Sequence, residues 1–261
     1  MTASRSWLAD CPAWEEREVQ RHYREDLDSL HSKFLPNPIP YREALQRRQA
    51  GEPLEYILNH CHVGPLSLQT DSRALIPRPE TETMLRKVVA EIESLPAGPL
   101  VDCGTGTGLI AAWLAKNTSR RVVATDIDPE ALVLAKENFM DNSLEVPVVQ
   151  SDRLAALSGG LAAVVANLPY VLPGAEKLEE EVKNYEPHRA LFIPGPPLQF
   201  YGDLFSQALN RLRPGGQLWL EATPLLIEKF TDLLRDFNCT IEIFSHRDLA
   251  GRLRYLQVKL C

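Results

Sequence analysis

The segment Asn167-Leu168-Pro169-Tyr170 contains the groups best suited to chemistry, because it directly follows the apolar run LAAVVA. The Asn167 side-chain oxygen and the Leu168 backbone carbonyl are two acceptors that could hold the two N–H bonds of a planar amide or amino group. Pro169 fixes the turn by locking φ, and the ring of Tyr170 can pack on a flat target group. An ordinary Asn-Pro turn beside a core tyrosine is the alternative interpretation.

A glycine-rich turn occurs earlier in the chain, in the sequence LVDCGTGTGL. Glycines at the end of a strand let the backbone approach a ligand closely and leave the N–H groups of the next helix unpaired. The residues expected to bind a nucleotide-like cofactor here are Gly104, Thr105, Gly106, Thr107 and Gly108. A plain strand-to-helix connection or a dinucleotide-binding dehydrogenase would use a similar turn.

Acidic residues end the next two predicted strands. Asp126 ends RVVATD, where it can accept hydrogen bonds from both ribose hydroxyls of an adenosine, and Ile127 belongs to the same expected site. Asp152 follows VPVVQ, near the expected adenine amino group, with Arg153 along the base. Asp128 suits the N-cap of the following helix, so we assign Asp126 to the ligand.

Short apolar runs alternate with helical ones from residue 99 onwards, which predicts an α/β fold with a doubly wound, mostly parallel sheet. The seven predicted strands lie at PLVDCG, RVVATD, VPVVQS, LAAVVAN, QLWLEAT, TIEIF and RYLQVKL. A loop alone joins the last two runs, which favours an antiparallel strand at the sheet edge. RPGG before QLWLE is expected to end a helix and start a strand.

The N-terminal part of the chain has a different pattern. Residues 13–34 are highly charged and free of Gly and Pro, which predicts a surface helix, and a shorter helix is expected from about Tyr41 to Gln49. HCHVGPLSLQTDSRAL has the turn residues and mixed polarity of a small hairpin. We therefore divide the chain into a helical region over 1–58, a hairpin linker over 59–75 and an α/β domain over 76–261.

The composition is that of a globular protein, with 44% hydrophobic and 24% charged residues among 261. We expect a cytoplasmic monomer without membrane association, because the sequence has neither a long apolar run nor a secretory signal. The five cysteines form no CxxC pair, so reduced thiols are expected rather than disulfides or a metal site. A formal charge of −7 argues against broad, unspecific nucleic-acid binding, while leaving a local basic patch possible.

The strand-end acids and the turn DCGTGTG resemble the class I S-adenosylmethionine-dependent methyltransferases over residues 76–261. This resemblance implies a seven-stranded Rossmann-like sheet, with S-adenosylmethionine held by the cofactor residues named above and by Asn167. The segment from Asn167 to Tyr170 is similar to the Asn-Pro-Pro-Tyr motif of the amino-methylating members. It implies a catalytic role for Asn167, Leu168, Pro169 and Tyr170 in holding the acceptor nitrogen in line with the methyl group.

Further segments resemble signature stretches of the release-factor glutamine methyltransferases, the HemK or PrmC family. They are EPLEYIL, LIPRPETE, YEPHRALF and RDLAGRLR. The resemblance implies methylation of the glutamine amide in the Gly-Gly-Gln tip of peptide chain release factors, which would be the protein partner. LIPRPETE is the most specific of these stretches, although a Pro-rich link that caps a helix at Thr81 or Glu82 also fits it. The chain's own Gly-Gly-Gln at Gly215 is expected to be a strand start.

Two departures from this family leave alternatives open. Leu168 stands where the family usually has Pro, and Asn-Leu-Pro-Tyr is familiar from rRNA adenine dimethyltransferases, so methylation of an rRNA adenine amino group is the alternative. The region before the hairpin is shorter than the substrate-recognition domain of HemK-like proteins. Another protein or a small-molecule amide therefore remains a candidate acceptor. A nucleotide-binding regulatory module would keep the glycine turn and Asp126 but would not need Asn167 or Tyr170.

Overall fold

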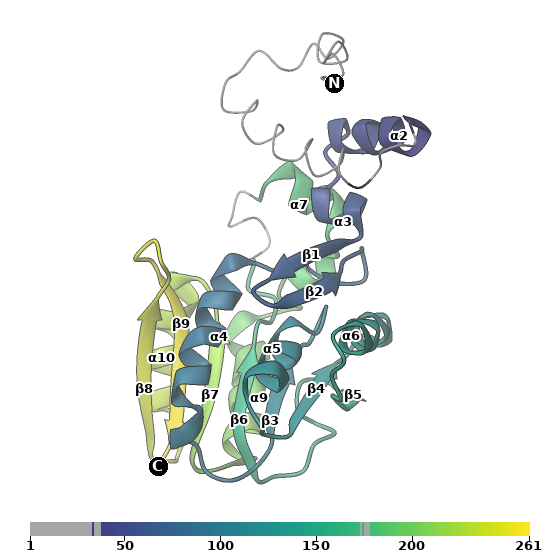
Figure 1. The fold of residues 1–261 in the computed structure, drawn as a ribbon. Helices are drawn as coiled ribbons and strands as arrows, with labels where there is room; N and C mark the ends of the chain where they lie inside the picture. Colours follow the sequence, from purple (N-terminus) through teal and green to yellow (C-terminus); the bar gives the residue numbers. More distant parts are fainter. Residues whose placement is uncertain (1–32, 34–37, 173, 175–177) are drawn as a thin grey trace. The chain divides into compact units, whose positions relative to one another are not determined.

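The computed structural model describes residues 33, 38–172, 174 and 178–261 (Figure 1). The chain divides into two compact units, with the boundary between Leu58 and Asn59. The charged helix predicted over residues 13–34 lies outside the described residues, except for Lys33.

The first unit contains helices α2 (Pro38–Gln49) and α3 (Leu54–Leu58). The sequence predicted the longer helix from about Tyr41, and the structure begins it earlier, at a proline. Proline is tolerated in the first turn because the N–H groups there have no partner within the helix. Ala44 and Ile57 are buried and form a small apolar cluster between the two helices.

The second unit begins with a two-stranded hairpin of β1 (His60–Val63) and β2 (Leu66–Gln69), as the sequence predicted. Gly64 adopts a φ of 53° in the turn, a conformation that glycine reaches without steric cost. Leu66 and Leu68 point into the core while the residue between them is exposed, which is the alternation of a strand with one covered face.

A seven-stranded sheet with the order β5-β4-β3-β6-β7-β9-β8 forms the centre of the second unit and confirms the predicted fold class. The strands are β3 (Leu100–Cys103), β4 (Val122–Asp126), β5 (Val148–Gln150), β6 (Leu161–Ala166), β7 (Leu212–Glu221), β8 (Ile241–Arg247) and β9 (Leu253–Leu260). Strands β3 to β7 run parallel. Every residue of β6 is buried, which explains why its sequence is continuously apolar.

The sequence predicted an antiparallel strand at the edge of the sheet. The antiparallel strand is β9, and it is the second strand from that edge. Strand β9 pairs antiparallel with β7 on one side and with β8 on the other, so β8 is the edge strand. The chain reaches β8 from β7 through a crossover helix, which makes those two strands parallel. The hairpin after β8 then returns β9 into the space between them.

The RPGG turn lies inside β7 rather than before it, which corrects the sequence prediction. Strand β7 already begins at Leu212, and its pairing with β6 is irregular over the following residues. Gly215 has a φ of 79°, and a Cβ on Gly216 would lie 2.8 Å from the Arg213 carbonyl oxygen, so both positions require glycine. Gln217 is 2% exposed, so the glutamine of the chain's own Gly-Gly-Gln is buried within β7.

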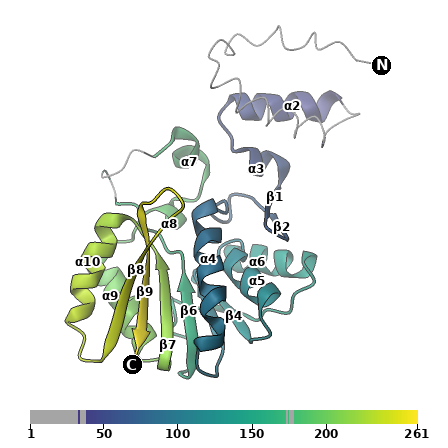
Figure 2. The same ribbon diagram turned by 60° about the vertical axis from the view of Figure 1, so that its left-hand side comes forward.

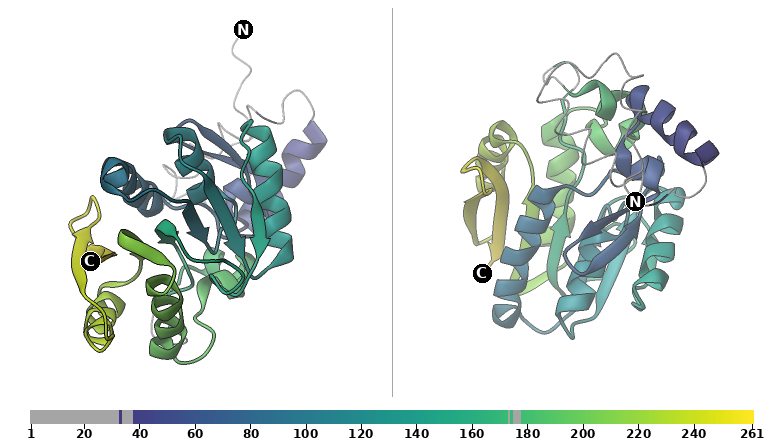
Figure 3. Two further views of the ribbon diagram at one scale, coloured as in Figure 1. Left: turned by 90° about the horizontal axis from the view of Figure 1, so that it is seen from below. Right: turned by 45° about the horizontal axis from the view of Figure 1, so that its top comes forward.

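Helices cover both faces of the sheet (Figures 2 and 3). They are α4 (Pro79–Glu91), the 3-10 helix η2 (Ile92–Ser94), α5 (Leu109–Asn117), α6 (Pro129–Asp141), α7 (Glu180–Tyr185), α8 (His188–Leu191), α9 (Pro197–Leu209) and α10 (Pro224–Arg235). One apolar core contains Met84, Trp113 and Phe139 from α4, α5 and α6. A second core contains Tyr201 and Phe230 from α9 and α10. Within the described ranges, no helix is both long and apolar enough to cross a membrane.

Asn138 of α6 joins the hairpin to the glycine turn. Its side chain is completely buried, and its Oδ1 accepts a hydrogen bond of 2.6 Å from the Gln69 N–H. Its Nδ2 donates to the carbonyl oxygens of Gln69, at 3.1 Å, and of Thr107, at 2.8 Å. One amide therefore holds three backbone groups from two separate segments.

We predict that Asn138→Ala lowers the free energy of unfolding by roughly 2–4 kcal/mol, because three hydrogen bonds of a buried side chain are lost together. Denaturant unfolding of the purified protein measures this. Asn142→Ala is the matched control: its amide also bonds a hairpin residue, Ser67, but at an exposed position. The control should lose less than about 1 kcal/mol. Equal losses in the two variants would contradict this role for Asn138.

Candidate active site

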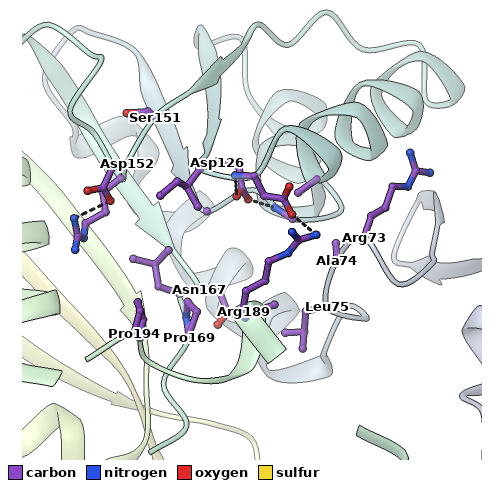
Figure 4. Close-up of a pocket in the computed structure, with 18 of the residues that line it drawn as sticks. Arg73, Ala74, Leu75, Asp126, Ser151, Asp152, Asn167, Pro169, Arg189 and Pro194 are labelled. Carbon is purple, nitrogen blue, oxygen red and sulfur yellow. Dashed lines mark hydrogen bonds and ion pairs between the residues drawn. The ribbon is translucent and has the colours of Figure 1, made fainter. Parts of the chain in front are cut away.

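A cavity of about 350 Å³ lies where β3, β4 and β6 end (Figure 4). The predicted site residues that line it are Gly104, Gly106, Asp126, Ile127, Asp152, Arg153, Asn167, Leu168 and Pro169. Thr105, Thr107, Gly108 and Tyr170 do not line it. The structure thus brings together residues that are far apart in the sequence. No cluster of His, Cys, Asp or Glu in the described residues could hold a metal ion.

Other lining residues had no place in the sequence prediction. They include Arg73, Leu75, Ser151, Arg189 and Phe200. Arg189 forms an ion pair with Asp128, and Arg73 forms ion pairs of 2.7 Å with Asp71 and Glu137. Leu75 and Arg189 belong to LIPRPETE and YEPHRALF, so these two stretches already contained a signal for them.

The glycine turn lies against the Asn167–Tyr170 segment. Gly104 has a φ of 78°, and a Cβ there would lie 2.4 Å from a methyl carbon of Leu168. The N–H groups of Gly104 and Thr105 donate to the Thr125 carbonyl at 2.8 and 2.9 Å, which fixes the turn to β4. The backbone of the turn therefore reaches the cavity without a side chain in between.

Asp102, in strand β3, stabilises the glycine turn through hydrogen bonds. Its side chain is fully buried, and its Oδ2 accepts hydrogen bonds from the Thr105 hydroxyl at 2.6 Å and from the Ala111 N–H at 3.0 Å. Its Oδ1 has no hydrogen-bond partner among the described residues. Burial raises the pKa of Asp102 to about 7, although both hydrogen bonds act in the opposite direction.

Asp128 is the N-cap of α6, as the sequence suggested, and Asp126 lines the cavity at the end of β4. Asp128 caps α6 by accepting a hydrogen bond of 3.0 Å from the Glu130 N–H. Asp126 accepts one backbone hydrogen bond on each oxygen, from Gly106 and from Asp128, both at 3.0 Å. Burial raises the pKa of Asp126, while these two bonds lower it. A carboxylate can accept about four hydrogen bonds, so Asp126 retains capacity for a ligand in the cavity.

Asp152 and Arg153 form one end of the cavity. Arg153 has a φ of 53°, and its guanidinium lies 4.5 Å above the ring centre of Phe200. It also donates a hydrogen bond of 2.8 Å to Asp152. A guanidinium stacked on an aromatic ring therefore lies beside a carboxylate at this end of the cavity.

Asn167 leaves the end of β6 and bonds to helix α4. Its Nδ2 donates to the Thr81 Oγ1 at 3.0 Å, and the Thr81 hydroxyl donates to Glu221 at 2.8 Å. No donor among the described residues contacts the Asn167 Oδ1. That oxygen is therefore available to a ligand.

The rest of the segment is held by two tyrosine hydroxyls. Tyr201 donates to the Pro169 carbonyl at 2.9 Å and lies 3.4 Å from the Leu168 carbonyl. Tyr170 donates to Glu221 at 3.3 Å, and burial raises the pKa of its phenol. These contacts fix the backbone of the segment, and the contact of Tyr201 with the Leu168 carbonyl is longer than its hydrogen bond to the Pro169 carbonyl.

LIPRPETE does more than connect the hairpin to α4. Glu186, from YEPHRALF, is buried, accepts a hydrogen bond of 3.1 Å from the Ile76 N–H and forms an ion pair with Arg78. The prediction that Thr81 or Glu82 caps the helix is wrong, because α4 begins at its proline, with Arg78 at the N-cap and no side-chain cap. The Thr81 hydroxyl is instead directed to the sheet.

The fold is the Rossmann-like fold of methyltransferases of known structure. A ribosomal protein L11 methylase from Lactobacillus delbrueckii subsp. bulgaricus has a TM-score of 0.53 and 22% identity, covering 72% of this chain and 81% of that chain. The T. thermophilus 16S rRNA N2 G1207 methyltransferase has a TM-score of 0.54 and 19% identity, covering 77% of this chain and 50% of that one. Residues 81–182 match the family described as methyltransferase small domain.

Sequence comparison identifies the family more narrowly. The chain is 36% identical to the release factor glutamine methyltransferase of Deinococcus radiodurans, over 83% of this chain and 78% of that protein. It is 41% identical to the protein of the same name from Moorella thermoacetica, over 81% and 76%. The chain belongs to the release factor glutamine methyltransferase family, which confirms the resemblance seen in its motifs.

We predict that Asp102→Asn gains stability relative to the native protein as the pH rises from about 4 to about 8. The folded-state pKa of Asp102 is raised from its ordinary 3.8 to about 7, so the folded state binds this proton more tightly than the unfolded state. The stability that Asp102 contributes therefore falls over this pH range. Asparagine does not titrate and lacks this loss.

Denaturant unfolding of both proteins across the pH range measures the difference. Asp232→Asn is the control, because the Asp232 side chain is 78% exposed, and its difference from the native protein should stay nearly constant. A difference that is equally constant for Asp102→Asn would contradict the raised pKa.

Proposed function

We propose that the protein transfers a methyl group from S-adenosylmethionine to the side-chain amide nitrogen of the glutamine in the Gly-Gly-Gln tip of a peptide chain release factor. The observation that carries this proposal is the geometry of Asn167. Its amide group is held by Thr81, its oxygen is available, and it stands at the cavity in a chain of the release factor glutamine methyltransferase family.

The residues around the cavity fit S-adenosylmethionine. A volume of about 350 Å³ lies within the range of small-molecule sites. Asp126 would accept hydrogen bonds from the ribose hydroxyls, with Ile127 beside it. Asp152 would accept from the adenine amino group, whose ring would lie along Arg153. The glycine turn from Gly104 to Gly108, which includes Thr105 and Thr107, would leave room for the amino-acid portion.

The catalytic task of this chain is to orient a weak nucleophile. Bound S-adenosylmethionine supplies a methyl group on a sulfonium, which is already an excellent leaving group. An amide nitrogen is nucleophilic only as it becomes pyramidal, because its lone pair is delocalised. The Asn167 Oδ1 and the Leu168 carbonyl would accept its two N–H bonds and stabilise the positive charge that develops. Orientation alone can supply roughly 7–11 kcal/mol.

Pro169 and Tyr170 would shape the pocket for the acceptor group. Pro169 restricts the turn that follows Asn167, and its carbonyl is held by Tyr201. Tyr170, whose hydroxyl is bonded to Glu221, would present its ring to the flat amide. Leu168 in place of the usual proline keeps the backbone carbonyl, and its side chain packs against Gly104.

Charge favours a protein acceptor over RNA. An amide and an adenine amine require the same two acceptors, so the segment from Asn167 to Tyr170 does not choose between them. The formal net charge of −7 repels a polyphosphate but tolerates a protein loop. We assign recognition of the release factor to residues 1–58 and expect the enzyme to act as a cytoplasmic monomer.

We predict that the purified protein with labelled S-adenosylmethionine methylates a release factor from its own source at the glutamine of Gly-Gly-Gln. Mass spectrometry of the digested factor locates the added methyl group. A factor in which that glutamine is replaced by alanine should take no label. Small-subunit rRNA, offered in parallel, should also stay unlabelled.

Label in the rRNA alone would contradict the proposal and favour the adenine amino group as acceptor. Label in neither substrate would also contradict it, and would direct attention to another protein or to a small-molecule amide.

A further inference from the structure

Glu221 is linked by hydrogen bonds to Tyr170 directly and to Asn167 through Thr81. It is the last residue of β7 and is only 1% exposed. One carboxylate oxygen accepts the Thr81 hydroxyl at 2.8 Å, and the other accepts the Tyr170 hydroxyl at 3.3 Å. Thr81 in turn accepts the Asn167 Nδ2 at 3.0 Å. A series of hydrogen bonds thus links β7 through α4 to the residue that follows β6.

We infer that Glu221 and Thr81 are positioning residues that set the direction of the Asn167 amide, so that its oxygen rather than its NH2 group faces the methyl acceptor. This inference rests on the proposed function, because only an acceptor with N–H bonds needs the oxygen there.

The direction follows from the donor and acceptor properties of the three groups. An ionised carboxylate only accepts hydrogen bonds, so the Thr81 hydroxyl must donate its single proton to Glu221. The Thr81 oxygen then faces Asn167 with lone pairs only, and it can accept from the NH2 group but cannot donate to the amide oxygen. Turning the amide over would place two acceptors against each other. The Asn167 Oδ1 is consequently directed away from Thr81.

Protonation of Glu221 would remove this constraint. A neutral carboxyl group can donate its proton to the Thr81 oxygen, and the Thr81 hydroxyl is then able to donate to Asn167. In that arrangement the Asn167 oxygen turns towards Thr81 and its NH2 group faces the acceptor. Two N–H groups would then oppose each other, and the acceptor nitrogen would lose one of its two partners.

The surroundings of Glu221 place this change within an accessible pH range. Burial raises the pKa of Glu221 to about 7, against the hydrogen bonds from Thr81 and Tyr170 and the positive charge of Arg254. Glu80 on α4 also raises it. Tyr255 on β9 and Tyr201 on α9 also interact with Glu221. The catalytic rate constant should therefore increase as the pH rises through about 7.

The test measures kcat and KM for release-factor methylation, at saturating S-adenosylmethionine, from pH 6 to pH 9. Thr81→Val removes the hydroxyl and keeps the branched shape, and should lower kcat by roughly tenfold, the effect of one lost buried hydrogen bond. KM for the release factor should stay within about twofold, because Thr81 does not contact the substrate. Thr81→Ser restores the hydroxyl and should recover most of the lost rate.

Glu221→Gln tests the protonation step. Glutamine does not titrate, so this variant should lack the fall in kcat that the native protein shows below about pH 7. Two controls match these changes in chemistry. Thr83→Val removes a hydroxyl of the same helix that donates to the Pro79 carbonyl. Glu242→Gln neutralises an exposed acid that pairs with Lys259. Both controls should keep the native rate and the native pH profile.

The outcomes separate the inference from the proposed function. No release-factor methylation by the native protein overturns the proposed function and the inference with it. Methylation by the native protein with an undiminished kcat in Thr81→Val overturns the inference alone. The same holds if Thr81→Ser is as slow as Thr81→Val, or if Glu221→Gln keeps the fall below pH 7. If Thr81→Val does not fold, the kcat of Thr81→Ser and the pH profile of kcat in Glu221→Gln still test the inference.

Discussion

The site depends on the register in which the three parallel strands β3, β4 and β6 pair. Cys103 of β3 lies opposite Thr125 of β4 on one side and Ala166 of β6 on the other. The three strands therefore end at the same level, and Gly104, Asp126 and Asn167 lie together at their carboxyl ends. A slip of two residues in β6 would move Asn167 by roughly 7 Å, far beyond hydrogen-bond range. A slip of one residue would instead turn the Asn167 side chain to the opposite face of the sheet.

Buried carboxylates then fasten separate segments to this edge. Asp102 holds the glycine turn, Glu186 holds the backbone of Ile76 and the side chain of Arg78, and Glu221 holds Thr81. A buried charge costs free energy unless its hydrogen bonds are satisfied, so each of these acids requires its partners in place.

Much of this arrangement could be predicted from the sequence, since apolar runs that end in Gly, Asp or Asn place those residues at one edge of a parallel sheet. The same rule points to Glu221, which ends QLWLE, but its role depends on Thr81, 140 residues earlier in the chain. Thr81 was interpreted as a helix cap because the start of a helix cannot be placed from Pro and Thr alone. Phe200 reaches the cavity only through tertiary packing, which leaves no local pattern.

The most direct test of this account compares cofactor binding with turnover in Asn167 variants. In Asn167→Ala, release-factor methylation should fall by roughly a hundredfold or more, while the affinity for S-adenosylmethionine from isothermal titration changes little, because Asn167 acts on the acceptor nitrogen. Asn167→Asp should bind the cofactor at least as tightly yet turn over slowly, since it adds a charge beside the sulfonium. Native turnover in Asn167→Ala would contradict the account.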